Sequence, residues 1–381
     1  MKLKQFTVKN FKCFDQITLD FSKTRDYTNL SEDVISQIDK KTKISNHSLL
    51  YGYNGSGKTS LCLALMDISK VLTDFERYDE GFVFNLYKFR NNSRNNYIYF
   101  EYIFDCDGKE LVYSYTKSDL YDLVREKLVY DGNLVFSYFF GDIKDQNVVN
   151  IPNLEHFATI DLDTKNSMVR YIQKVGNYNG KEIDSLIQFA SKMLYFRSTN
   201  EGNRYIGYKK GVSVLLDEIA EMNLINEYKE FLKSAGLDYE LIRTNNIITN
   251  KPTIAVKMGE NILSFDAVAS SGTKVLTLFF FWLQSFNELS FIIIDEYDAY
   301  YHDSLAKMIY KIVCSFPAQT LVTTHNNSLL SYDYTRPDCV YITNGKRIEN
   351  LSTLASEFNM KEIRKGNSMK NIYERFIEKM K

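Results

Sequence analysis

A glycine-rich segment near the N-terminus constrains the fold of this chain more than any other feature. Residues 52–59 read Gly-Tyr-Asn-Gly-Ser-Gly-Lys-Thr and satisfy the pattern G-x-x-x-x-G-K-[ST]. The apolar run 49–51 comes directly before them, and a helical pattern extends from Thr59 to about Leu72. In this order the glycines let backbone N–H groups and the helix N-terminus face an anion. The sequence therefore predicts an α/β fold with a phosphate-binding loop.

The residue types inside this loop predict how a nucleotide is held. Lys58 is expected to reach the β- and γ-phosphates of ATP, and the Thr59 hydroxyl to bind Mg²⁺. The other predicted nucleotide contacts come from the same loop and the start of its helix: Asn54, Gly55, Ser56, Gly57 and Ser60. A glycine turn before an ordinary helix is the structural alternative.

Two apolar runs in the second half of the chain end in polar residues. The run 291–294 is followed by Asp295 and Glu296, and the run 320–324 by His325. Strands buried on both faces of a parallel sheet have this form, and their carboxyl ends face active sites. We expect Asp295 to hold Mg²⁺, directly or through water, and Glu296 to polarise the attacking water. His325 is predicted to sense the γ-phosphate, although a His satisfied within a loop is the simpler explanation.

Ser271 and Gly272 precede an apolar helix that includes residues 275–283. A serine hydroxyl, a glycine N–H and a helix N-terminus together predict a second anion site. Capping of the buried helix explains the same residues and is compatible with that prediction.

Charge and cysteine content narrow the functional classes. The 47 Lys and Arg residues nearly balance 48 Asp and Glu, so no strong basic field covers the whole chain, although a local basic surface stays open. Five cysteines without a C-x-x-C pair indicate reduced thiols and a cytoplasmic protein. The longest apolar run, 275–283, is too short to cross a membrane.

The pattern along the chain predicts three parts: 1–150 with the phosphate loop and an antiparallel meander over 82–142, a helical insertion with return strands over 151–262, and a C-terminal part over 263–381. No segment carries apolar heptads over three or four repeats, so no coiled-coil arm is expected. Shorter elements are predicted as strands at 3–8, 16–21, 239–244 and 253–258, and as helices around 31–38, 184–195 and 212–235.

The order of these motifs resembles the ATPase heads of the ABC superfamily. The start at 8–14, Val-Lys-Asn-Phe-Lys-Cys-Phe, is similar to the first residues of SMC, RecF and OLD-type heads. Residues 295–299 with His302, and the segment 364–368, look like AAA ATPases grouped with abortive-infection proteins. The resemblance covers about 1–75 and 262–381. It implies that Ser271 and Gly272 of one subunit close over the ATP held by another.

The chain also departs from that pattern. Ser271-Gly272-Thr273-Lys274 replaces the full Leu-Ser-Gly-Gly-Gln signature, and only Gln173 and Gln188 are candidates for the Q-loop glutamine. OLD-type nucleases carry a C-terminal TOPRIM module of about a hundred residues. Because 56 residues follow His325 in this sequence (381 − 325), no nuclease is expected within it.

The resemblance implies an ATP-hydrolysing switch that forms a homodimer or higher homo-oligomer around ATP. In antiphage defence such a switch controls a separate effector, a nuclease or toxin, which we expect to be encoded nearby. A RecF-like DNA-binding clamp in repair is the alternative, and the basic residues of 361–381 keep nucleic acid open as a partner, although a solvated helix face explains them too. A metabolic phosphotransferase would need a substrate pocket, for which the sequence offers no residues.

Overall fold

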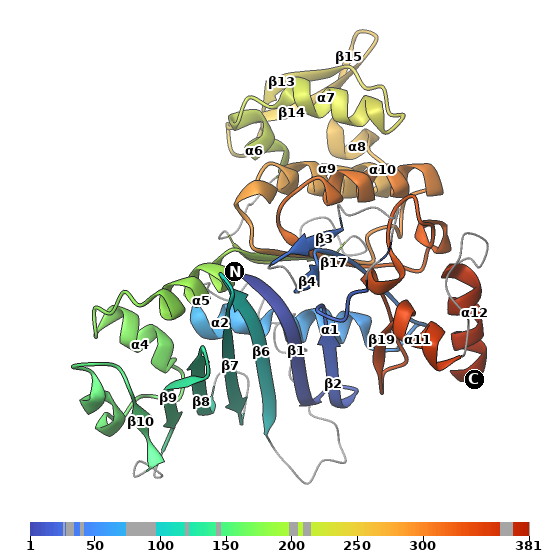
Figure 1. Ribbon diagram of the computed structural model, residues 1–381. Helices are drawn as coiled ribbons and strands as arrows, with labels where there is room; N and C mark the ends of the chain where they lie inside the picture. The colour runs from blue at the N-terminus through green and yellow to red at the C-terminus, as the bar shows by residue number, and fades with distance from the viewer. Residues whose placement is uncertain are drawn as a thin grey trace.

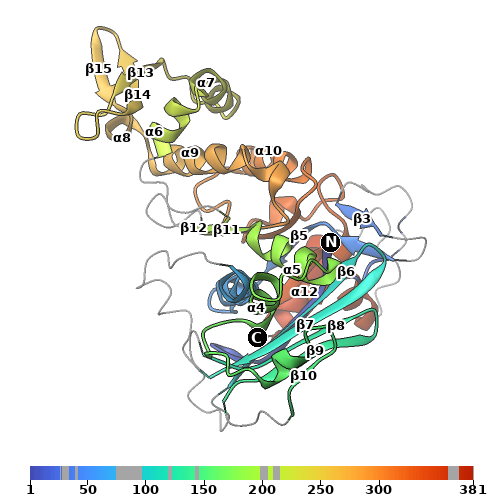
Figure 2. The same cartoon turned by 90° about the vertical axis from the view of Figure 1, so that its left-hand side faces the viewer.

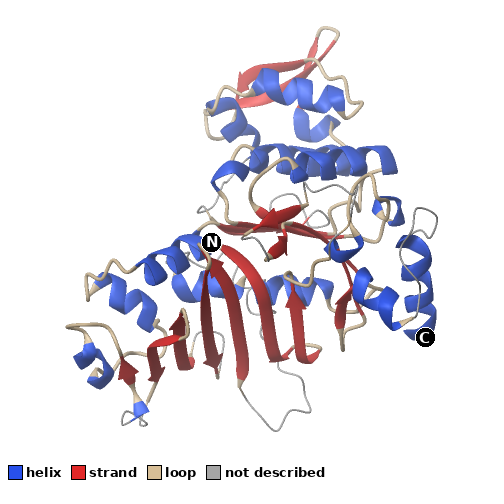
Figure 3. Ribbon diagram, in the orientation of Figure 1, coloured by secondary structure: helices blue, strands red, loops and turns tan. Residues whose placement is uncertain are grey.

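Two large β-sheets form the body of the protein in the computed structural model, which describes residues 1–25, 27, 34–38, 42–73, 97–118, 122–141, 146–197, 205–208, 215–358 and 369–380. One sheet is antiparallel and the other mainly parallel, and helices lie on both sides of the parallel sheet (Figure 1, Figure 3). The predicted α/β class with an antiparallel lobe is thereby confirmed.

The antiparallel sheet has the strand order β10-β9-β8-β7-β6-β1-β2. Its strands alternate apolar side chains toward a core, as in β6, where every second residue is buried. The predicted meander is present where the chain is described, although residues 82–96 lie outside that part. The hairpin at the N-terminus extends the same sheet. The strands are β1 Lys2–Phe11, β2 Phe14–Asp20, β6 Ile98–Cys106, β7 Lys109–Lys117, β8 Leu123–Tyr130, β9 Asn133–Phe139 and β10 Val148–Val149.

The second sheet has the order β12-β11-β16-β17-β5-β18-β19. The five central strands run parallel, and the two outer strands pair antiparallel to them. All residues of β5, β16 and β17 are buried, which explains the unbroken apolar run 291–294 of β16. The strands are β5 His47–Tyr51, β11 Met193–Arg197, β12 Tyr205–Gly207, β16 Phe291–Asp295, β17 Gln319–Thr323, β18 Val340–Thr343 and β19 Ile348–Asn350.

Helices cover both faces of this sheet. Phe291 and Ile293 face a core shared with the antiparallel sheet and with helices α1, α2, α4 and α5. Ile292 and Ile294 face the opposite core, formed with α9 to α12. The helices are α1 Lys58–Leu65, α2 Asp67–Leu72, α4 Met168–Lys174, α5 Lys181–Ser191, α9 Ser271–Leu283, α10 Asp303–Cys314, α11 Leu351–Glu357 and α12 Met369–Met380, with short η2 Glu155–Thr159, η3 Phe286–Glu288, η4 Asn327–Leu329 and η5 Pro337–Cys339.

A smaller unit lies beyond α9, away from the parallel sheet (Figure 1, Figure 2). Its three strands pair in the order β13-β14-β15 and pack on short helices. Among the described residues the longest helix, α9, has 13 residues, so this part of the chain contains no coiled-coil arm and no helix able to cross a membrane. The elements of this unit are α6 Leu215–Glu221, α7 Ile225–Ser234, β13 Leu241–Asn245, β14 Pro252–Met258, β15 Asn261–Ser264 and α8 Phe265–Val268; a separate pair consists of β3 Ile35–Gln37 and β4 Lys43–Ser45.

Several predicted helices differ from the structure. The helix expected over 184–195 ends at Ser191, and the chain continues as β11 because that segment pairs with β16. The helix expected over 212–235 is divided into α6 and α7 near Asn223, whose φ of +58° is left-handed and incompatible with a continuous helix. Around 31–38, the described residues 35–37 form strand β3 rather than a helix.

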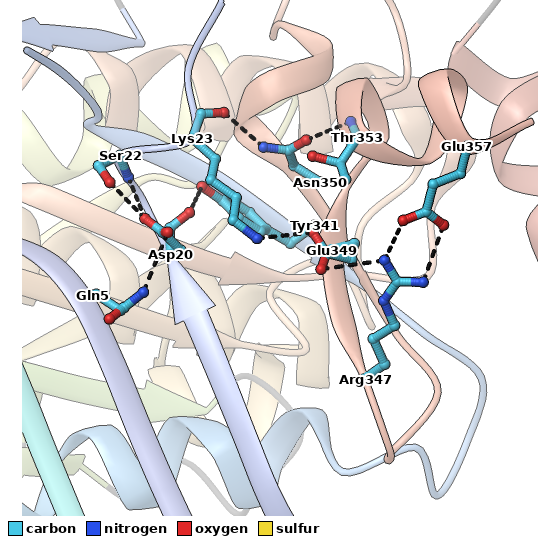
Figure 4. A network of polar contacts seen from close by, with 10 residues as sticks. All are labelled: Gln5, Asp20, Ser22, Lys23, Tyr341, Arg347, Glu349, Asn350, Thr353 and Glu357. Carbon is cyan, nitrogen blue, oxygen red and sulfur yellow. Dashed lines mark hydrogen bonds and ion pairs between the residues drawn. The ribbon is translucent and has the colours of Figure 1, made fainter. Parts of the chain in front are cut away.

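A polar network fastens the C-terminal hairpin β18–β19 to the antiparallel sheet (Figure 4). The Asp20 carboxylate accepts hydrogen bonds from the backbone N–H and hydroxyl of Ser22, at 2.9 and 2.7 Å. The Asp20 carbonyl accepts one from the Tyr341 hydroxyl at 2.9 Å, and the Asn350 amide donates to the Lys23 carbonyl at 2.8 Å. These bonds fix the hairpin next to the strand that carries the phosphate loop.

Candidate nucleotide site

The phosphate loop connects the central strand β5 to helix α1, and its glycines are required by backbone shape and by packing. Gly55 and Gly57 have φ values of +80° and +91°, which residues with a β-carbon rarely adopt. A β-carbon on Gly57 would lie 2.7 Å from Cys13 Sγ and 2.7 Å from the Phe14 ring. One on Gly52 would lie 2.4 Å from Ser56 Oγ. The loop is thus a tight curl held against the turn between β1 and β2.

The ammonium group of Lys58 lies over this curl. It donates hydrogen bonds to the carbonyl oxygens of Gly52 at 2.9 Å and Tyr53 at 3.3 Å. Burial lowers the pKa of Lys58, and the negative charges of Asp295 and Glu296 act in the opposite direction. The predicted phosphate ligand is therefore within the electrostatic reach of both predicted acidic residues.

Asp295 ends strand β16 and is completely buried. Its carboxylate accepts a hydrogen bond from Thr59 Oγ1 at 2.7 Å, although the two residues are 236 positions apart. Thr323 at the end of β17 donates to the other oxygen at 2.6 Å, and the Tyr195 hydroxyl donates at 3.3 Å. Burial raises the pKa of Asp295, while the bonds from Thr323 and Thr59 and the charge of Arg197 oppose that shift. The two predicted Mg²⁺ ligands thus lie side by side.

Glu296 lies one residue further, in a left-handed backbone conformation with φ of +52°. Its N–H donates to Thr323 Oγ1 at 2.8 Å. Its carboxylate pairs with Arg197, with Nη2 2.8 Å from Oε1 and Nε 3.2 Å from Oε2. A conformation of this kind costs about 1–2 kcal/mol for a residue with a β-carbon. The Glu296 side chain is therefore held at the sheet edge by contacts from β17 and β11.

Arg197 and Tyr195 belong to the site but are not among the predicted site residues; the helix predicted over 184–195 includes Tyr195 and ends before Arg197. Arg197 stands directly opposite Asp295 in the parallel register of β11 and β16. The signal that identifies them is the form of the run 193–197, in which four apolar residues precede a charged one, as in 291–295. Two such runs predict neighbouring strands of one parallel sheet.

His325 follows β17 and is exposed. Partial burial lowers its pKa, and the charge of Lys58 lowers it further, whereas Asp298, Glu296 and Asp295 act to raise it. These influences place the imidazole in the electrostatic field of Lys58 and the acidic residues. Thr324, its neighbour, donates to Asp298 at 2.8 Å and so anchors the turn that carries the histidine.

The predicted second anion site lies elsewhere in the same chain. Ser271 and Gly272 begin α9, which packs on the face of the parallel sheet opposite to α1 (Figure 1). The helix cap is Ser270, whose hydroxyl accepts from the Thr273 N–H at 3.2 Å, and Ser271 is exposed. Ser271 is therefore accessible at the start of α9, and its contact with ATP held by a second copy of the chain stays a prediction.

Neither glutamine considered for the Q-loop belongs to this constellation. Gln173 of α4 donates to Asp184 of α5 at 3.1 Å, and Gln188 is exposed on α5.

The donor set fits ATP with Mg²⁺. The Ser56 hydroxyl is buried in the loop without a hydrogen-bond partner among the described residues, so it can donate to a phosphate oxygen. Asn54 and Gly55 are exposed at the loop, and Ser60 lies in the first turn of α1. The described residues contain no group of three or more His, Cys, Asp or Glu side chains that could hold a metal ion. A pair such as Thr59 and Asp295 suits Mg²⁺, which usually combines few protein oxygens with phosphate oxygens and water.

Comparison with known proteins identifies a family. Residues 48–331 match the model described as "AAA domain, putative AbiEii toxin, Type IV TA system". No curated protein matches the chain.

Solved structures with a similar course of the chain have low sequence identity to it. An Smc head bound to the C-winged helix domain of ScpA is 16% identical over 95% of this chain and 100% of that one, with a TM-score of 0.47. The SMC head domain from Thermotoga maritima is 16% identical over 92% and 99%, with a TM-score of 0.42. The recombination mediator protein RecF is 14% identical over 92% and 98%, with a TM-score of 0.41. All three TM-scores lie below 0.5, so these likenesses carry no functional information.

Proposed function

Since the chain belongs to the AbiEii-type AAA domain family, we propose that it binds ATP with Mg²⁺, hydrolyses it, and forms a head-to-head dimer around it. The observation that carries this proposal is the 2.7 Å hydrogen bond between Thr59 of the phosphate loop and Asp295 at the end of β16. This bond brings together two side-chain oxygens that can bind a metal ion. They lie beside the loop over which the Lys58 ammonium is held. A solvated strand end would not be expected to make this contact.

Each residue has a distinct part in this proposal. Lys58 exchanges its carbonyl partners for the β- and γ-phosphates, while the loop N–H groups and Ser56 hold the remaining oxygens. Thr59 and Asp295 hold Mg²⁺, which when bound neutralises phosphate charge. Glu296 orients the attacking water and accepts its proton, and His325 donates to the γ-phosphate. Because these groups come from β5, β16 and β17, the rigid sheet fixes their relative positions.

The position of Ser271 supports the dimer. In one chain α9 and α1 pack on opposite faces of the sheet, and Ser271 at the start of α9 is exposed, which supports its presentation to a nucleotide held by a second subunit. ATP then favours the dimer to the extent that it binds the closed form better than the open form. We extend this to control of a separate effector, a nuclease or toxin encoded nearby, in antiphage defence. The family description refers to a two-component toxin–antitoxin system, which supports a second protein but does not specify its role. None of the cysteines in the described part of the chain forms a disulfide, which supports a cytoplasmic site of action.

The central test uses Glu296→Gln, which keeps the side-chain shape but removes the proton acceptor. Wild-type protein should hydrolyse ATP, and the variant should lose at least about a hundredfold in rate, as expected for loss of a general base. With ATP and Mg²⁺ the variant should also double its molar mass in light scattering. Glu110→Gln is a matched control, because Glu110 forms an exposed ion pair with Lys4 at 2.7 Å outside the site.

Two outcomes would count against the proposal. If wild-type protein neither bound nor hydrolysed ATP, the proposed function would be wrong. If ATP bound but the Glu296→Gln mass stayed monomeric, the dimer would be wrong. Purification of this variant from its host, followed by identification of bound protein and nucleic acid, tests the effector. ATP-stimulated, salt-dependent binding to DNA ends or gaps would favour the clamp used in repair instead.

A further inference from the structure

We propose that Arg197 is the residue that distinguishes ATP from ADP: it pairs with Glu296 in the free protein and moves to the γ-phosphate when ATP binds. The inference rests on the proposed ATPase function and assigns a phosphate ligand from a strand that carries none of the family motifs described above.

The position of Arg197 supports a ligand role. The residue ends β11 beside β16, and its Nε lies 3.5 Å from the Asp295 oxygen that also accepts the Thr59 hydroxyl. The guanidinium is therefore at the same carboxyl edge as the predicted Mg²⁺ ligands. It is also accessible, since its side chain is 25% exposed and that of Glu296 26%, whereas Asp295 is fully buried.

Charge explains why the pair with Glu296 can exchange. Burial acts to lower the pKa of the Arg197 guanidinium, but the hydrogen bond to Glu296 and the charges of Asp295 and Glu296 raise it overall. The arginine thus compensates two neighbouring carboxylates. When Mg²⁺ is bound, Thr59 and Asp295 would hold it, and its charge would supply part of that compensation. A phosphate group then offers the planar guanidinium two oxygens and a higher charge than a carboxylate.

The exchange has a consequence for Glu296. While Arg197 donates to both carboxylate oxygens, each oxygen has one acceptor position fewer for water. When the guanidinium leaves, Glu296 can accept the proton of the attacking water. ADP has no γ-phosphate and therefore leaves the pair intact, so Arg197 couples ATP recognition to the release of the general base.

The test compares dissociation constants for ATP and ADP, measured by calorimetry with Mg²⁺ present, in wild type, Arg197→Gln and Arg197→Lys. Arg197→Gln should reduce the preference for ATP over ADP about tenfold or more, because one charge-assisted hydrogen bond to the γ-phosphate is lost. Nearly all of this change should come from weaker ATP binding. Arg197→Lys keeps the positive charge but lacks the two-point hydrogen bonding of a guanidinium, so it should retain part of the preference for ATP over ADP.

Arg347→Gln is the matched control, because Arg347 makes a similar fork with Glu357 outside the site (Figure 4). It should leave the ATP-to-ADP ratio unchanged. A wild-type ratio in Arg197→Gln and Arg197→Lys, or equal weakening of both nucleotides, would show that Arg197 is only structural and would overturn the inference while leaving the ATPase proposal in place. A wild-type protein that binds neither nucleotide would overturn the proposed function itself.

Discussion

Replacing Asp295 by asparagine separates stability from nucleotide binding. Burial raises the pKa of Asp295 above its usual value of 3.8. A folded pKa above the unfolded one means that the stabilising effect of the bound proton is complete below pH 3.8 and is lost as pH rises through the folded pKa. Near pH 7.5 the ionised carboxylate therefore lowers the free energy of unfolding, by about 1.4 kcal/mol for each unit of the shift.

Asp295→Asn removes this cost while retaining the shape of the side chain. The hydroxyls of Thr59 and Thr323 can rotate to accept from the amide or donate to it, so few hydrogen bonds are lost. The free variant should be as stable as wild type, or more stable by up to about 1.4 kcal/mol. Its affinity for ATP with Mg²⁺ should fall about tenfold to a hundredfold, because a charged ligand has become neutral.

Thermal unfolding with and without nucleotide measures both effects. A ligand at a hundred times its Kd adds about 2.7 kcal/mol to the free energy of unfolding. For 381 residues the unfolding entropy is about 0.8 kcal/mol per K, so the wild-type Tm should rise by about 3 °C. At the same nucleotide concentration the variant should shift by less than about 2 °C, and EDTA should remove most of the difference between the two proteins.

Asp338→Asn is the matched control. Asp338 is equally buried but pairs with buried Arg336 at 2.8 Å, outside the site. Breaking that pair should cost about 3 kcal/mol and lower Tm by about 4 °C, while the response to ATP stays intact. The reasoning would be refuted if Asp295→Asn destabilised the free protein as much as Asp338→Asn does, or if it kept the full shift with ATP and Mg²⁺.

Three further changes test other parts of the molecule. Lys58→Met should weaken ATP binding about a hundredfold in equilibrium dialysis. It should cost little stability, because burial disfavours the charged form of the Lys58 ammonium. Unchanged binding would exclude Lys58 as a phosphate ligand. Ser271→Arg, in a Glu296→Gln background, should abolish ATP-driven dimerisation in sedimentation experiments yet leave ATP binding by the monomer, whereas Ser270→Ala should only weaken the α9 cap by about 1 kcal/mol. His47 is buried between Asn46 and Thr320, and burial followed by the charge of Lys2 lowers its pKa to about 3. As the pH falls, the unfolded chain therefore binds a proton at His47 before the folded protein does. Urea denaturation should show that the free energy of unfolding falls by about 2 kcal/mol between pH 6.5 and 5, and His47→Gln should reduce this loss.

The parts of the site that could be predicted from sequence are those specified by short contiguous patterns. The phosphate loop is complete within eight residues, and the runs before Asp295 and His325 identify parallel strands by their composition. Because carboxyl ends of parallel strands share one edge, the meeting of Thr59 and Asp295 follows from these patterns. The trans role of Ser271 stays a prediction, since it depends on a second copy.

The apolar run before Arg197 is a weaker signal than the phosphate loop, because β11 is only five residues long and its first four residues are buried. A short apolar run has neither the period of a helix nor that of a half-exposed strand, so its pairing with β16 decides its conformation. The separation of α6 from α7 is different, since Asn223 tolerates a left-handed backbone and marks the break within the sequence. The division of the predicted helix 59–72 at Met66 has no comparable signal.

The strand order has a consequence for how the protein is made. Strand β5, which carries the phosphate loop, lies between β17 and β18, so His47 meets Thr320 across 273 residues. The antiparallel sheet, in contrast, uses neighbours within the first 149 residues. During synthesis the strands of the antiparallel sheet therefore emerge first and can pair with one another. Strand β5 can pair only after β17 and β18 have been translated. Premature termination before β17 would leave β5 without its neighbours in the sheet, and an exposed strand of this kind favours aggregation or degradation.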